Sequence, residues 1–229
     1  MIPAFVIRLK GIKTSEDLAL ECIKSCDALG LEVTPFDGIF GEQLISFAHL
    51  QQGLRPWKQK MKKGRTGVKG CFLSHFSLWR RSVQLDTPII IFEQDAVLLR
   101  PIPKDIEHHF KEFLMLDPYN KMRGDYGENH TKDDSKEWRV EEYFNPDSSS
   151  KYGVTHQYTM GLQAYIIKPK AAKKLIRAVK ENGYLPADIQ CNKGIINIET
   201  IYPSVAAINT KFWGNKGLMK QESTTHKKW

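Results

Sequence analysis

The pattern of apolar and polar positions predicts a strand, a helix and a second strand at the start of the chain. Residues 3–9 and 31–36 are short apolar runs typical of buried strands. Between them, Thr14 or Ser15 can cap a helix that ends at Gly30. Its apolar stripe repeats at helical spacing, at Leu18, Cys22, Cys26 and Leu29. The short joints indicate a βαβ unit, which implies a right-handed crossover and a parallel sheet.

The most apolar stretch, residues 87–98, contains two carboxylates one residue apart, Glu93 and Asp95. A strand this apolar is typical of the middle of a parallel sheet, where both faces are buried and ligands bind beyond the carboxyl ends of the strands. Residues two apart on an extended segment point the same way, so both carboxylates can face one hard cation or one ribose-diphosphate. An ordinary acidic turn after a strand is the alternative that this pattern leaves open.

A helix is predicted before this strand. It begins at Gly70, and Ser74 and His75 lie off its apolar face. That face is formed by Phe72, Phe76, Trp79 and Val83. After the strand, residues 103–116 are also compatible with a helix.

The second half of the chain begins with a weakly patterned segment, residues 117–158, rich in Gly, Asn, Asp, Ser and Lys. A long segment of this kind inside a compact domain is expected to act as a lid or acceptor loop. A strand is predicted within residues 160–167, followed by a helix that starts at Pro169. Asp188 then follows a proline turn, and residues 189–202 continue as sheet or helix.

Length and composition favour one α/β domain over residues 1–229. The first strand is not followed by a glycine-rich fingerprint, which disfavours a classical NAD site. The cysteines lack metal-finger spacing and are expected to be buried thiols. No apolar stretch reaches the length of a membrane span, and no signal-peptide pattern opens the chain. A soluble, cytoplasmic protein is therefore expected. It would work either at the inner face of a membrane or on DNA.

The formal charge of +8 favours a polyanionic partner such as nucleic acid, an anionic membrane surface or a phosphorylated donor. Basic residues concentrate between Arg55 and Lys69, with Trp57 among them and no acid. This loop suits the binding of phosphates, and a merely solvated surface segment is the alternative. Residues 209–229 are also basic and form either a frayed end or a tail that folds over a diphosphate.

Three sequence segments occur in a fixed order, and their combination is a far more specific signal than any one of them. They are Gly-Cys-Phe-Leu-Ser-His at 70–75, Phe-Glu-Gln-Asp-Ala-Val at 92–97 and Ala-Tyr-Ile-Ile-Lys-Pro-Lys-Ala-Ala at 164–172. Together they resemble glycosyltransferase family 25, best known for lipooligosaccharide galactosyltransferases and related collagen-modifying domains. The chain differs from the family in two places: it has Glu-Gln-Asp at 93–95 where the family usually has Glu-Asp-Asp, and Arg-Leu-Lys at 8–10 where the first strand often ends in Asn-Leu-Asp.

The resemblance implies a GT-A type fold, here a single Rossmann-like domain with a mostly parallel central sheet flanked by helices and a long irregular insertion. It also implies a nucleotide-diphosphate sugar donor, expected to be a UDP-sugar, and transfer with inversion. A divalent cation, Mn²⁺ or Mg²⁺, would neutralise the leaving diphosphate. Asp95 is the expected metal ligand, and Glu93 is expected to bind the ribose or to join the metal site. Asp188 is the candidate base, with an ordinary turn or N-cap aspartate as the alternative.

Four further residues are candidates for the site. His75 is a candidate to donate to a phosphate or to the acceptor, and the alternative is a helix histidine satisfied by local hydrogen bonds. Arg65 and Lys69 lie at the entry to the same helix, where side-chain charge and helix N-terminal amides together can bind donor phosphates. Arg8, at the end of the first strand, completes the expected donor-binding set.

Two acceptor classes fit the basic composition. For a lipopolysaccharide-type saccharide, the basic surface would hold the protein against anionic lipid or a phosphorylated inner core. For DNA, the basic loop and tail would track phosphates, Trp57 or Trp213 would support an unstacked base, and a hydroxymethylated base would be the acceptor. We place the saccharide first. A non-catalytic nucleic-acid-binding domain, in which Glu93 and Asp95 are incidental, is the alternative from a different class.

Overall fold

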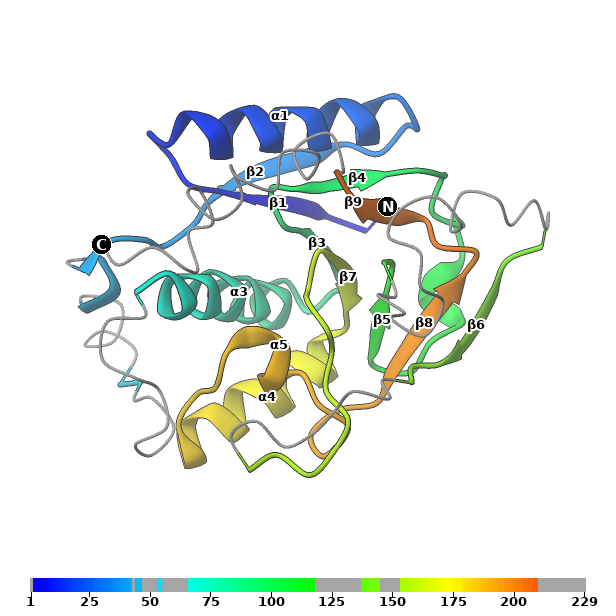
Figure 1. Ribbon diagram of the computed structural model, residues 1–229. Helices are drawn as coiled ribbons and strands as arrows, with labels where there is room; N and C mark the ends of the chain where they lie inside the picture. The colour runs from blue at the N-terminus through cyan, green and yellow to red at the C-terminus, as the bar shows by residue number, and fades with distance from the viewer. Residues whose placement is uncertain are drawn as a thin grey trace.

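The computed structural model describes residues 2–42, 44–46, 53–54, 66–117, 137–144 and 153–209. They contain a seven-stranded sheet with the order β2-β1-β3-β7-β5-β8-β6 (Figure 1). Its strands are β1 (Ala4–Arg8), β2 (Val33–Asp37), β3 (Ile89–Phe92), β5 (Phe113–Met115), β6 (Arg139–Glu142), β7 (Ala164–Ile167) and β8 (Ile198–Tyr202). A second sheet pairs β4 (Ala96–Leu98) with β9 (Ala206–Ile208). The helices are α1 (Lys13–Asp27), α3 (Thr66–Leu85), α4 (Pro169–Asn182) and α5 (Ala187–Gln190), with a short 3₁₀ helix, η1 (Ile106–His108).

Strand directions in the large sheet place several loops at one edge. β1 pairs in parallel with β2 and β3, and β5 pairs in parallel with β8. β7 is antiparallel to both of its neighbours, β3 and β5, and β6 is antiparallel to β8. Five strands therefore run in one direction, which confirms the expected α/β class with a mostly parallel sheet. The carboxyl ends of β1, β3 and β5 and the amino end of β7 share one edge.

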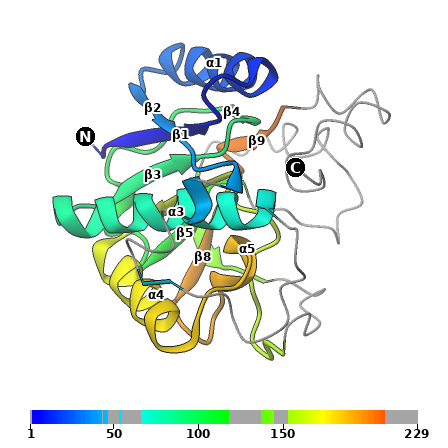
Figure 2. The same ribbon diagram turned by 90° about the vertical axis from the view of Figure 1, so that its left-hand side faces the viewer.

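Helices cover both faces of the sheet. Figures 1 and 2 show α1 on one side and α3, α4 and α5 on the other. Alternate residues of β3 serve the two layers: Ile91 packs in the cluster with α3 and α4, and Ile90 packs in the cluster with α1. All four β3 residues are buried, as the sequence predicts for a strand covered on both faces. Cys22 and Cys26 lie in the α1 layer and are fully buried, also as predicted.

Two local predictions are wrong. Residues 103–116 do not form a helix; they contain η1 and strand β5. The short β5 is fully buried in the middle of the sheet, so its sequence lacks the alternation that would identify it. In α1, Ile12 is the N-cap residue and no side chain caps the helix. Ser15 instead lies inside the first turn, where its hydroxyl accepts a hydrogen bond from the Leu9 amide and donates one to Gln94.

Helix α3 is packed more deeply than its apolar face suggests. Ser74 and His75, off the predicted stripe, are both buried. The Ser74 hydroxyl donates to the carbonyl of Gly70 and accepts a hydrogen bond from the Ile39 amide. Gly70 allows this approach, because a Cβ there would lie 2.2 Å from the Ile39 carbonyl oxygen. The helix therefore contacts the segment after β2 through backbone as well as side chains.

Much of the expected lid and tail lies outside the described residues. From the 117–158 segment, β6 forms one edge of the large sheet, whereas residues 118–136, 145–152 and 210–229 are among those not described. Within the described part of the chain, no helix is both long and apolar enough to cross a bilayer.

Candidate functional site

The acidic segment after β3 is held from both sides. The Glu93 amide donates to the Gln163 carbonyl at 2.8 Å, which joins it to the start of β7. The Asp95 carbonyl accepts a hydrogen bond from the Asn209 amide at 2.7 Å, just after β9. The expected extended geometry from Glu93 to Asp95 is wrong, because β3 ends at Phe92 and Gln94 and Asp95 form a turn. Gln94 accepts the hydrogen bond from Ser15 of α1.

Four carboxylates affect one another at this edge. Burial, and then the charge of Glu93, raise the pKa of Asp95 to about 7. Burial, and then the charge of Asp95, raise the pKa of Asp117 to about 7. Burial also raises the pKa of Asp188 to about 6, with a further contribution from Glu93 and opposition from the Ile189 amide and His75. These acids resist ionisation because they are removed from water and repel one another, and a bound cation would relieve both effects.

Asp117 was not among the residues selected from the sequence. It follows β5 directly, is 7% exposed, and lies at the same edge as Glu93. The sequence predicts a helix over residues 103–116, which include the apolar run before it, and places Asp117 at the start of a weakly patterned segment. An acid at the end of a short apolar run was the available signal.

His75 is linked to Glu93 and to the core by hydrogen bonds at both of its ring nitrogens. Its Nε2 lies 3.1 Å from Oε1 of Glu93, and its Nδ1 lies 2.8 Å from the hydroxyl of Tyr165. Trp79 Nε1 donates to the same hydroxyl at 3.0 Å. All these groups are satisfied when the Tyr165 hydroxyl donates to Nδ1 and Nε2–H donates to Glu93. The geometry thus makes His75 a residue that orients Glu93.

Cys71 lies one helical turn before His75 and beside the same carboxylate. Its Sγ is 3.9 Å from Oε1 of Glu93. Burial, and then the charge of Glu93, raise the pKa of the Cys71 thiol well above its usual value. The ligand atoms of Cys71, His75 and Glu93 all lie within 4.8 Å of one another.

Asp188 lies in the short helix α5, whose N-cap residue is Pro186. Its Oδ1 accepts a hydrogen bond from the next amide, that of Ile189, at 3.0 Å. Its carbonyl accepts a hydrogen bond from the Thr159 hydroxyl at 2.8 Å. Asp188 is therefore not an N-cap residue, and its half-buried carboxylate belongs electrostatically with Glu93.

Of the basic candidates, Arg8 and Lys69 lie in the described part of the chain. Arg8 ends β1, at the same edge as Glu93, and its Nε donates to Oδ1 of Asp37 at 2.9 Å. Lys69 lies in the first turn of α3, before Cys71. Arg65 and most of the basic 55–69 loop lie outside the described residues.

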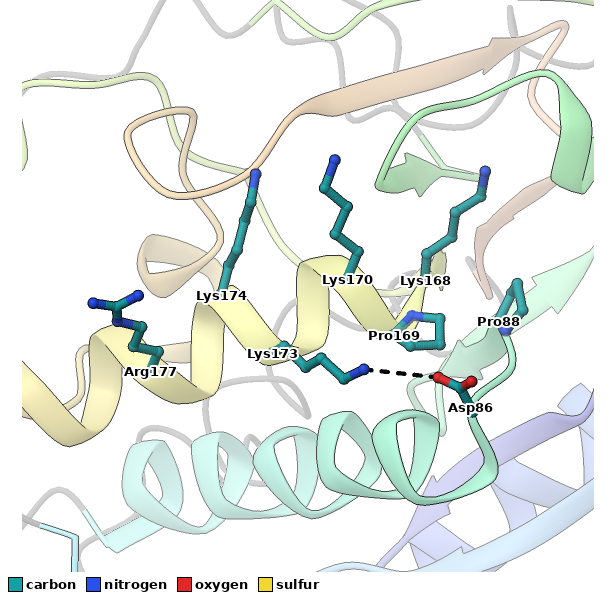
Figure 3. A pocket seen from close by; sticks show the side chains of 8 residues that line it. All are labelled: Asp86, Pro88, Lys168, Pro169, Lys170, Lys173, Lys174 and Arg177. Carbon is teal, nitrogen blue, oxygen red and sulfur yellow. Dashed lines mark ion pairs between the residues drawn. The ribbon is translucent and has the colours of Figure 1, made fainter.

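A basic groove lies at the opposite edge of the sheet, between the start of β3 and α4 (Figure 3). This cavity of about 600 Å³ is lined by Asp86, Pro88, Lys168, Pro169, Lys170, Lys173, Lys174 and Arg177. Lys168, Lys170 and Lys174 point to the same side in Figure 3, and Lys173 Nζ lies 3.7 Å from Asp86. The groove is separate from the carboxylate cluster, because Asp86 precedes β3 and Glu93 follows it.

Comparison with known proteins gives a consistent family. Residues 1–191 match the model of the family described as Glycosyltransferase family 25 (LPS biosynthesis protein). Proteins described as "Glycosyltransferase 25 family member" are 26% identical over 178 residues in Anopheles gambiae, covering 72% of this chain and 27% of the relative. In Aedes aegypti the identity is 26% over 176 residues, covering 71% and 26%. The chain thus matches about a quarter of the length of these relatives.

Among solved structures, the "crystal structure of a glycosyltransferase involved in the glycosylation of the major capsid of PBCV-1" aligns over 79% of this chain and 68% of that chain. The TM-score is 0.33 and the identity 6%, so this likeness carries no weight for function. The family match spans most of the chain and includes the segments that bear Cys71, His75, Glu93, Asp95, Asp117 and Asp188. The chain therefore belongs to glycosyltransferase family 25.

Proposed function

We propose that this chain transfers a hexose or pentose from a nucleotide-diphosphate sugar, most simply a UDP-sugar, to an acceptor hydroxyl with inversion. The observation that carries the proposal is the convergence of Glu93, Asp95, Asp117 and Asp188 at the carboxyl edge of the sheet, with raised pKa values for the last three. Such an edge is where ligands bind in open α/β sheets. The cluster provides oxygen ligands for a cation and a base for the acceptor.

The carboxylates at the turn after β3 fit a divalent cation, Mn²⁺ or Mg²⁺. Asp95 and Glu93 would hold it, and the proximity of Asp117 to Asp95 adds negative charge. Hard cations prefer such oxygen ligands. When bound, the cation would neutralise charge on the leaving diphosphate. The chain's own contribution is to keep the half-buried Asp95 in place through the backbone hydrogen bond from Asn209.

Asp188 is our candidate for the general base. An inverting transfer needs a group that removes the acceptor proton on the face opposite the diphosphate. A carboxyl with a pKa raised to about 6 accepts a proton more readily than an ordinary aspartate and is still ionised at neutral pH. The hydrogen bonds of Asp188 to Ile189 and Thr159 fix the backbone and one carboxylate oxygen.

The donor would be bound by residues around the carboxylates. Glu93 would accept from the ribose hydroxyls or bind the cation, with its orientation set by His75. Arg8, Lys69 and Arg65 would bind the diphosphate. Arg8 lies at the same edge of the sheet as Glu93 and would have to exchange its contact with Asp37 for a phosphate.

For the acceptor we propose a lipopolysaccharide-type saccharide, in keeping with the family's description as an LPS biosynthesis protein. The basic groove along α4 would then contact anionic lipid or a phosphorylated core from the side opposite the carboxylates. DNA with a hydroxymethylated base is the alternative acceptor. A non-catalytic nucleic-acid-binding domain remains the alternative from another class, and it gives no reason for the carboxylate cluster.

The roles of the two half-buried acids can be separated experimentally. Asp188→Asn should retain binding of the nucleotide sugar and lose transfer by about 100-fold or more, because a general base contributes about 10²- to 10⁴-fold. Asp95→Asn should lose cation-dependent donor binding. The configuration of the product, determined by NMR, tests inversion. If Asp188→Asn retains transfer, Asp188 is not the general base, and Asp117 becomes the next candidate.

A further inference from the structure

We propose that Cys71, His75 and Glu93 form a second cation site, selective for a thiophilic divalent ion such as Zn²⁺, and that its occupation inhibits the transferase. The inhibition rests on the proposed function, whereas binding of the ion does not. Two of the ligands, Cys71 and His75, are four residues apart on one face of α3, and Glu93 faces them from the end of β3.

The distances suit a small tetrahedral ion. Nε2 of His75 is 3.1 Å and Sγ of Cys71 is 3.9 Å from Oε1 of Glu93, and all three atoms lie within 4.8 Å of one another. With Zn–N and Zn–O bonds of about 2.0–2.2 Å and Zn–S bonds of about 2.3 Å, tetrahedral ligand atoms are roughly 3.3–3.8 Å apart. Small side-chain movements would therefore bring three ligands onto one ion and leave a fourth position for water.

The ligand types distinguish this site from the oxygen site at Asp95. Thiolate and imidazole select zinc and related ions, whereas carboxylates and water suit Mg²⁺ and Mn²⁺. The surroundings favour a cation as well, because the charges of Glu93, Asp188 and Asp95 all act on the Cys71 thiol. A bound ion would compensate these charges and stabilise the thiolate.

Tyr165 supplies the outer hydrogen bond that a metal-binding histidine requires. Its hydroxyl lies 2.8 Å from Nδ1 of His75. When Nε2 binds an ion, the ring proton is carried on Nδ1, which donates a hydrogen bond to the Tyr165 oxygen, and the Tyr165 hydroxyl proton turns away from the ring. The imidazole remains neutral in this exchange, and the Cys71 thiol gives its proton to the solvent. Binding of one ion therefore releases about one proton.

Glu93 links this site to the transfer reaction. The same carboxylate is proposed to bind the donor ribose or the Mn²⁺ or Mg²⁺ ion. A zinc ion on Cys71 and His75 would hold Glu93 and withdraw it from the donor. We therefore expect zinc to raise the donor KM of an enzyme assayed with excess Mg²⁺.

The test is a Co²⁺ titration of the full chain without nucleotide sugar, followed by displacement with Zn²⁺. The wild type should give a thiolate-to-cobalt charge-transfer band that saturates at one equivalent. Cys71→Ser should abolish the band and weaken zinc binding by at least about tenfold. Cys22→Ser is the matched control, because Cys22 and Cys26 are a second place where a thiol lies beside another possible ligand. This variant should retain the band. Asp95→Asn should also retain it.

The proposal is overturned if the wild type shows no band or if Cys71→Ser keeps it. If Cys71→Ser unfolds, the wild type alone can be tested. Calorimetry of zinc binding in two buffers of different ionisation enthalpy measures the number of protons released, and release of no proton contradicts a thiolate site. The two proposals fail separately. If the protein binds zinc but transfers no sugar, the cation site stands and the proposed transferase function is wrong. If it transfers sugar and zinc does not inhibit the transfer, only the proposed inhibition is wrong.

Discussion

The imidazole Nε2 of His75 lies 3.1 Å from Oε1 of Glu93, which connects the buried core of α3 to the carboxylate at the end of β3. His75 is fully buried, and its other ring nitrogen is bonded to Tyr165. In the proposed reaction, His75 would act through Glu93 and not by direct contact with the substrate. The carboxyl edge of the sheet is thus supported by hydrogen bonds that begin in the core.

The first prediction concerns His75. His75→Asn should raise the KM for the nucleotide sugar and lower kcat/KM by about 10- to 100-fold, because Glu93 loses the group that orients it. His75→Gln should recover part of this loss, since its amide nitrogen can reach the position of Nε2. His109→Asn, at an exposed histidine paired with Asp105, is the control. A loss confined to kcat, or equal in Gln and Asn variants, would contradict a positioning role.

The second prediction concerns Tyr165, whose hydroxyl is shared by Trp79 and His75. Tyr165→Phe should lower the free energy of unfolding by about 1–3 kcal/mol, because buried polar groups lose their partner. Urea unfolding monitored by tryptophan fluorescence measures this change. An unchanged midpoint would show that the hydroxyl does not stabilise the buried chain.

The third prediction concerns pH and Asp95. The pKa of this carboxyl is raised in the folded protein to about 7, from about 3.9 when unfolded. Its contribution to stability is therefore complete below about pH 4 and is lost as the pH rises through about 7. Without divalent cations, Asp95→Asn should be more stable than the wild type at pH 8, and the difference should shrink towards pH 5. Thermal unfolding across this range is the measurement, and a difference independent of pH would contradict the raised pKa.

Features of this site that lie within one stretch of the chain could be predicted from the sequence. Contacts between residues far apart in the chain could not. β3 could be identified because four consecutive apolar residues are buried on both faces. Asp117 was missed because the strand before it is very short. The bonds of His75 could not be predicted, since Glu93 and Tyr165 lie 18 and 90 residues away in the chain. Similarly, the cap expected at Ser15 was replaced by a contact with Gln94, 79 residues away.

The fourth prediction concerns the close contact at Gly70. Gly70→Ala places a methyl group 2.2 Å from the Ile39 carbonyl oxygen, so α3 or the segment after β2 must move. We expect a loss of about 1–3 kcal/mol in the free energy of unfolding. Arg80→Ala, at an exposed position of α3, should be nearly neutral. A Gly70→Ala protein as stable as the wild type would contradict the close packing.

The fifth prediction concerns the basic groove. Reversing two exposed charges of α4, as Lys170→Glu with Lys173→Glu, should weaken binding to vesicles that contain anionic lipid, most strongly at low salt. Lys13→Glu with Lys24→Glu on α1 changes the net charge equally and should have a smaller effect. Equal losses in both double variants, measured by vesicle sedimentation, would indicate a general charge effect and not a groove.

Release of nucleoside diphosphate from a panel of UDP- and GDP-sugars tests the central claim most directly. The assay contains Mn²⁺ or Mg²⁺, with lipooligosaccharide or hydroxymethylcytosine-containing DNA offered in parallel. We predict acceptor-dependent release with one UDP-sugar, abolished in Asp95→Asn and retained in Asp17→Asn, an exposed acid on α1. Release that is unaffected by Asp95→Asn, or no release with any donor alongside tight, salt-sensitive nucleic-acid binding, would contradict the proposed function.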